Sequence, residues 1–248
     1  MSLSRLALRL ATVHALKGQT IAADRVKDSA IASIDALADG QKAPFISVYT
    51  DDAETSSRSA DTLFGSATVN LVIEMAIVAR ADVDGQTLLA HPPTDATIES
   101  ELDRMERRIR IALRGGTEWA AVWRRFVLSI DSIKSVRGGS AEKGNRFAAR
   151  QMEFAVAILA EPAPGQTPAE AWTDLLGLLD ASPDLASIAA MIREELDGSG
   201  SVEEMKRTHY APVDRQHLGN VILANPLPGA LVVTAQHPPR EDEPFAVE

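Results

Sequence analysis

Three carboxylates and a lysine are the residues of this chain most able to act together in chemistry. Asp51 and Asp52 end one apolar run, while Glu74 and Lys134 lie in two further runs that predict β-strands. Gathered on a sheet, they could hold Mg²⁺ as metal-dependent nucleases do. However, acids at the end of a strand commonly serve solubility, and Glu74 falls on the half-exposed face of its strand. A nuclease is therefore the less favoured alternative.

Other residues that often build sites show no pattern. The five histidines have neither H-E-x-x-H nor H-x-H spacing; they are His14, His91, His209, His217 and His237. The glycine-rich segment 138–144 lacks the Gly-Lys-Ser/Thr order and the following helix of a phosphate-binding loop. The absence of cysteine excludes disulfides and thiolate metal sites. We expect neither enzyme activity nor a metal or cofactor.

Composition favours a protein partner. The chain has 248 residues, 45% of them hydrophobic, and a net charge of -10, which argues against coating nucleic acid. No apolar run approaches the roughly 20 residues that span a bilayer. Arg5 and Arg9 interrupt the N-terminal leucines, so we expect neither a membrane anchor nor a cleaved signal.

Two strands organise the expected fold. Residues 44–52 and 68–80 are rich in β-branched and apolar residues and predict an antiparallel pair joined by a long polar connection. In the second run Val69, Leu71, Ile73, Met75 and Ile77 alternate, so the helices should cover that face.

Further elements follow the same periodicities. Apolar spacing predicts amphipathic helices over 3–17 and 98–113, and the pairs Asp103/Arg107 and Glu106/Arg110 should support the second. A short strand is expected over 25–31, and two more over 126–136 and 146–160, the first with Phe126, Leu128 and Ile130 on one face. Trp119 and Trp123 should cap the edge of the core.

The C-terminal third of the sequence predicts helices and short strands outside the main sheet. Residues 168–179 and 183–196 predict two helices with proline near their first turns, and short strands are expected over 218–224 and 230–235 before an acidic tail. We therefore predict an α+β fold: a mostly antiparallel, mixed sheet of four to five strands with helices on one face and a C-terminal helical extension. The expected divisions are 1–161, 162–200 and 201–248.

The order of these elements resembles a known family. An N-terminal amphipathic helix precedes Val-Lys-Asp-Ser (26–29) and Pro-Phe-Ile-Ser-Val-Tyr-Thr-Asp (44–51). A long second strand, a Glu/Arg-rich helix, an aromatic-bearing linker and a strand ending Gln-Met-Glu-Phe-Ala-Val-Ala-Ile (151–158) follow. Over residues 1–161 this pattern resembles the phage tail terminators, the minor tail protein U family of phages and prophages.

The resemblance implies a structural role without catalytic residues. Members form a ring, expected here to be a hexamer, that caps the tail tube, stops its polymerisation and offers a surface to the head-completion protein. DNA would only pass through the lumen, and the protein would be assembled in the bacterial cytoplasm into the virion tail. A head-tail connector role and a host adaptor of similar fold stay open, because residues 167–235 have no counterpart in the family.

Exposure and composition, rather than a residue match, suggest where such contacts would lie. We expect them in two hairpin loops, over 51–66 and 137–146. The candidate interface residues are Asp51, Asp52, Glu54, Arg58, Arg137, Lys143 and Arg146.

Overall fold

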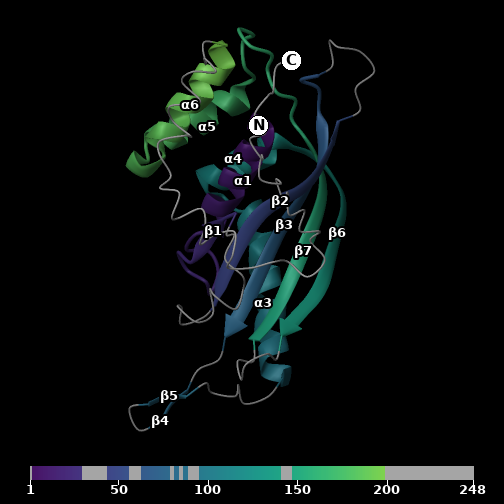
Figure 1. Cartoon of the computed structure of the whole chain (residues 1–248), viewed down its shortest axis with the longest axis vertical. Helices are drawn as coiled ribbons and strands as arrows, with labels where there is room; N and C mark the ends of the chain where they lie inside the picture. The colour runs from purple at the N-terminus through teal and green to yellow at the C-terminus, as the bar shows by residue number, and fades with distance from the viewer. Residues whose placement is uncertain are drawn as a thin grey trace, which may run out of the picture. The chain divides into compact units, whose positions relative to one another are not determined.

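The compact unit over residues 1–199 is built on a five-stranded mixed sheet (Figure 1). The computed structural model describes residues 2–29, 44–55, 63–78, 81–83, 86–88, 95–140 and 147–198. The strands are β1 (Val26–Asp28), β2 (Phe45–Thr55), β3 (Ala67–Val78), β6 (Val127–Ser140) and β7 (Phe147–Ile158), in the order β1-β2-β3-β7-β6. Only β1 pairs in parallel, with β2. A separate ribbon pairs β4 (Ala81–Val83) with β5 (Gln86–Leu88). The predicted α+β fold with a mixed sheet is confirmed.

The two faces of the sheet differ as the alternation in β3 predicts. Val69, Leu71, Ile73 and Met75 are fully buried and belong to the main core together with helix residues. The opposite face carries Glu74, Val72 and a small separate cluster made of Phe45, Ala76 and Ala149, which are register partners across three strands.

Three helices pack on the core-facing side of the sheet: α1 (Leu3–Leu16), α3 (Asp95–Arg114) and α4 (Glu118–Phe126) (Figure 1). The Ser2 hydroxyl caps α1 by accepting a hydrogen bond from the Arg5 amide, and Thr117 caps α4 in the same way. On α3 the predicted stripe is buried at Leu102, Met105 and Ile109. Both predicted N-terminal helices are therefore confirmed.

The expected strand over 126–136 begins differently. Phe126 is the last residue of α4 and is fully buried, while Leu128 and Ile130 are 57% and 44% exposed. The prediction that these three residues share a strand face is therefore wrong. The helical spacing of Val122 and Phe126 prevails locally, and two register irregularities in β6, at 127–129 and 130–132, interrupt simple alternation.

The C-terminal helices belong to the same compact unit as the sheet. The predicted pair is present as α5 (Glu170–Asp180) and α6 (Ala186–Asp197), the latter preceded by a 3-10 turn, η3 (Pro183–Leu185), and ended by Gly198 at φ 71°. Trp172 is fully buried and meets Phe126 edge to face at 4.9 Å. Residues 1–199 form one unit, and the strands predicted after residue 200 lie outside the described residues.

None of the helices in the described ranges is by itself long and apolar enough to cross a membrane. By length and composition alone, Glu170–Asp180 and Pro183–Asp197 qualify only together, as a pair bent by 119°.

His14 of α1 stacks on Trp119 of α4, with ring centroids 4.4 Å apart. Burial, with a smaller effect of the nearby Lys17 charge, lowers the pKa of His14 to about 4, although Asp28 acts in the opposite direction. The folded protein therefore favours the neutral imidazole.

Replacement of Trp172 by Ala should lower the free energy of unfolding by about 3–5 kcal/mol, because a fully buried aromatic ring leaves a cavity between α4 and α5. Urea denaturation measures the change. Ile111→Ala on α3, at a side chain that is 42% exposed, is the control and should shift stability by less than about 1 kcal/mol. An unchanged unfolding midpoint for Trp172→Ala would show that α5 is not part of the core.

Stability should also fall as pH drops from 6.5 towards 4, because the unfolded chain binds a proton at His14 in this range and the folded chain does not. His14→Phe keeps an aromatic ring against Trp119 and removes the titration. Thermal melting at pH 7 and pH 5 should therefore show a smaller difference for the variant than for the parent protein. An equal difference in both proteins would contradict the assignment.

Candidate functional site

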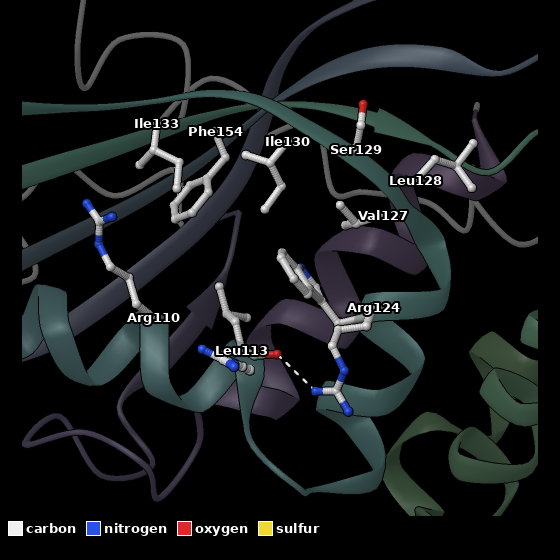
Figure 2. Close-up of a pocket in the computed structure, with 11 residues that line it drawn as sticks. Arg110, Leu113, Arg124, Val127, Leu128, Ser129, Ile130, Ile133 and Phe154 are labelled. Atoms are coloured by element: carbon white, nitrogen blue, oxygen red, sulfur yellow. Dashed lines mark hydrogen bonds between the residues drawn. The ribbon is translucent and has the colours of Figure 1, made fainter.

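A groove of about 670 Å³ lies between β6, the C-terminal end of α3 and the helix α4 (Figure 2). Its floor is apolar and includes Leu113, Trp123 and Phe154, each at most 5% exposed. The buried Nε1 of Trp123 has no hydrogen-bond partner among the described residues.

One wall of the groove is the edge strand of the sheet. β6 pairs only with β7 in the described part of the chain, so its other side has no neighbouring strand. Leu128, Ile130, Ile133 and Val136 on this strand are between 37% and 57% exposed. An edge strand with exposed apolar side chains is a surface suited to association with another chain.

Three arginines line the helical side of the groove. Arg124 closes the end of α3 by donating a hydrogen bond to the carbonyl oxygen of Leu113, at 3.2 Å (Figure 2), and another to that of Gly115, at 2.7 Å. Arg110 pairs with Glu106 at 2.7 Å, as the helical spacing predicts. Arg114 has no carboxylate partner within the described ranges. The groove therefore combines an apolar floor with positive charge.

A second arginine cluster fastens α3 to the sheet next to the groove. Arg150 of β7 is 14% exposed and contacts Glu99 at 2.9 Å, Glu106 at 3.2 Å and also Asp103. Asp103 therefore pairs with the sheet, and the expected Asp103/Arg107 pair is wrong. Arg150 shares the buried face of β7 with Met152 and Phe154, and an arginine in such a position is a sequence signal for carboxylate partners.

The cluster changes the ionisation of its members. Burial alone would raise the pKa of Glu106, but hydrogen bonds from Arg110, Ser135 and Arg150 outweigh it, and the pKa is lowered. Burial acts to lower the pKa of Arg150, and its carboxylate partners raise it overall. Both groups are therefore charged in the folded protein.

The structure does not gather the nuclease candidates into a site. Lys134 lies 3.4 Å from Glu153, and burial raises the pKa of Glu74, which favours its neutral form. Asp51 and Asp52 are exposed at the far end of β2. Within the described residues no three metal-ligating side chains are placed to hold an ion.

The predicted interface residues lie partly on strands. Asp51, Asp52 and Glu54 belong to β2, because the strand continues through a register irregularity after Thr50 and still pairs with β3. Their placement in a loop is therefore wrong, although they are exposed as expected.

Arg137 also lies on a strand, β6. Its Nε is 2.8 Å from Glu99 Oε1, so the two side chains form an ion pair, although the geometry is not that of a hydrogen bond. Its placement in a loop is wrong because the β6–β7 pairing extends to Ser140. Arg58, Lys143 and Arg146 lie outside the described residues.

Comparison with known proteins does not assign the chain to a family. No protein-family model matches the sequence, and no curated protein matches it.

Arg150→Ala should lower the free energy of unfolding by about 2–3 kcal/mol, because Glu99 and Glu106 lose a partly buried partner. The loss should shrink at acid pH. Because folding lowers the pKa of Glu106, its carboxylate stabilises the fold at pH values above its ordinary pKa of 4.5, and protonation at lower pH removes that contribution.

Denaturant unfolding at pH 7 and pH 4 measures both effects. Arg150→Lys retains the positive charge but lacks the forked N–H donors of the guanidinium, and it should lose part of the stability. Arg108→Ala, at an exposed position of α3, is the control. Equal stability of Arg150→Ala and the parent protein at pH 7 would contradict the role of the cluster.

Proposed function

We propose that this chain is a structural component of a phage or prophage tail, a ring-forming terminator that caps the tail tube and offers a surface for head joining. The observation that carries the proposal is the exposed apolar edge of the sheet, where β6 borders an open groove. Such a surface suits a protein that works by association with other protein chains.

The order of the elements also supports this role. The chain begins with a helix, a short strand and the strand pair β2 and β3. Later come the Glu/Arg-rich helix α3, a Trp-bearing helix and the closing pair β6 and β7. This is the order on which the resemblance to tail terminators rests. The proposed partners are further copies of the chain, the tail tube protein and the head-completion protein.

The alternatives have less support. A head-tail connector would use the same kind of surface, and the addition of α5 and α6 to the core leaves room for such a role. A nuclease would need the carboxylates of β2 and β3 to act together with Lys134, which instead lies near Glu153. A host adaptor of similar fold would make no tail contacts at all.

Disruption of the gene in a producing lysogen, followed by electron microscopy of the particles, tests the proposal. A terminator predicts abnormally long tail tubes beside heads without tails, because nothing stops tube growth or joins the head. Complementation with the intact gene should restore tails of normal length. Tails of normal length that fail to join heads would favour the connector, and fully normal particles would overturn the tail role.

A further inference from the structure

The sheet has two edges of opposite character at the same level. Across the strands, Ala53 of β2 lies in register with Val69 of β3, Val156 of β7 and Ile130 of β6. The next row places Glu54 of β2 and Ser129 of β6 at its two ends. The C-terminal end of β2 and the groove beside β6 therefore lie at opposite ends of the same rows.

The β2 edge is acidic, and none of the described strands lies beside it at this level. β1 covers only residues 46–48 of β2. Beyond them Asp51, Asp52 and Glu54 are exposed, and in the described part of the chain their carboxylates have no cationic partner. Arg5 does contact the strand here, but through the backbone carbonyl of Asp51.

Exposed apolar side chains accompany these acids. Leu63 is 69% exposed and Phe64 is 43% exposed, and both share a hollow with Thr55, the last residue of β2. We call this set, Asp51, Asp52, Glu54, Leu63 and Phe64, the acidic edge.

The opposite edge is complementary in both respects. The groove presents Arg110, Arg114 and Arg124 together with the exposed Leu128 and Ile130. Acids with two large apolar side chains on one edge thus match arginines with exposed apolar side chains on the other.

We propose that the acidic edge of one copy docks into the groove of the next copy, with carboxylates against the arginines and Leu63 and Phe64 against the exposed side chains of β6. The inference deepens the proposed function and rests on its ring. Each contact joins two different surfaces, so successive copies associate head to tail. Because both surfaces lie at the same level of the strands, successive copies are displaced across the strands, and a rotation between copies closes them into the proposed ring.

Cysteine cross-linking tests the contact directly, because the chain contains no cysteine of its own. The double variant Glu54→Cys with Arg114→Cys, treated with a short bis-maleimide, should give a ladder of oligomers on a denaturing gel. A mixture of the two single variants should give cross-linked dimers. The matched control, Glu54→Cys with Arg108→Cys, places the second cysteine on α3 outside the groove lining and should give no ladder.

Charge reversal gives a second, independent readout by sedimentation. Asp52→Lys with Glu54→Lys, and separately Arg114→Glu, should each weaken self-association at least about tenfold, because like charges then meet. Mixing the two variant proteins should restore association, since every junction again has opposite charges. Asp184→Lys with Glu194→Lys, at exposed positions remote in sequence from both edges, should associate as the parent protein does. Circular dichroism checks that each variant is folded.

The outcomes separate this contact from the proposed function. The contact would be overturned, but the ring would not, if the protein is oligomeric and the Glu54→Cys, Arg114→Cys variant gives no cross-link. The same conclusion would follow if the charge reversals do not change self-association. A parent protein that is monomeric at every concentration would overturn it as well. Cross-links together with normal particles from the gene-disrupted strain would support the contact and overturn the tail role.

Discussion

The groove depends on the way in which one arginine of the sheet holds α3. Arg150 lies on the buried face of β7 and is surrounded by carboxylates from successive turns of α3. A guanidinium in such a place is costly without partners, and the partners fix both the position and the rotation of the helix. With α3 held in this way, Arg110 and Arg114 line the groove, and Arg124 of α4 binds the last carbonyls of α3.

The same arrangement leaves the edge of the sheet open. The helices α1, α3 and α4 cover the face of β3 and β7, and α5 adds to the core through Trp172 and Phe126. β6, by contrast, is exposed over residues 128–137 and has no neighbouring strand on its outer side among the described residues. Its irregular register exposes Leu128 and Ile130, which a monomer gains nothing by exposing.

An assembly role explains this combination more simply than catalysis does. Charged groups of the described core include ion pairs that fix a helix, as at Arg150, while others lie exposed on the two edges. The groups with shifted pKa values follow the same division: His14 and Glu74 are shifted by burial, and Glu106 by its ion pairs. Polar residues that fasten elements and apolar residues exposed at an edge are the features on which the proposed assembly role rests.

Local sequence patterns were enough to predict several elements of the fold. The alternation over 69–75 identified the buried face of β3, and the apolar spacing over 98–113 identified α3. These features were readable because each depends on neighbours within a turn or a strand.

Contacts between residues far apart in the chain could not be predicted from such patterns, because the fold brings these residues together. Arg150 and Glu106 are 44 positions apart, so neither their contact nor the loss of the Asp103/Arg107 pair follows from helix spacing. The same holds for the acids of β2, which remain in a strand because β2 resumes pairing with β3 at Ala53 after the irregularity. It also holds for Phe126, where the sequence fits both a strand pattern and a helix pattern and the structure forms a helix. Register and strand order set these outcomes, because they bring together residues that no local period connects.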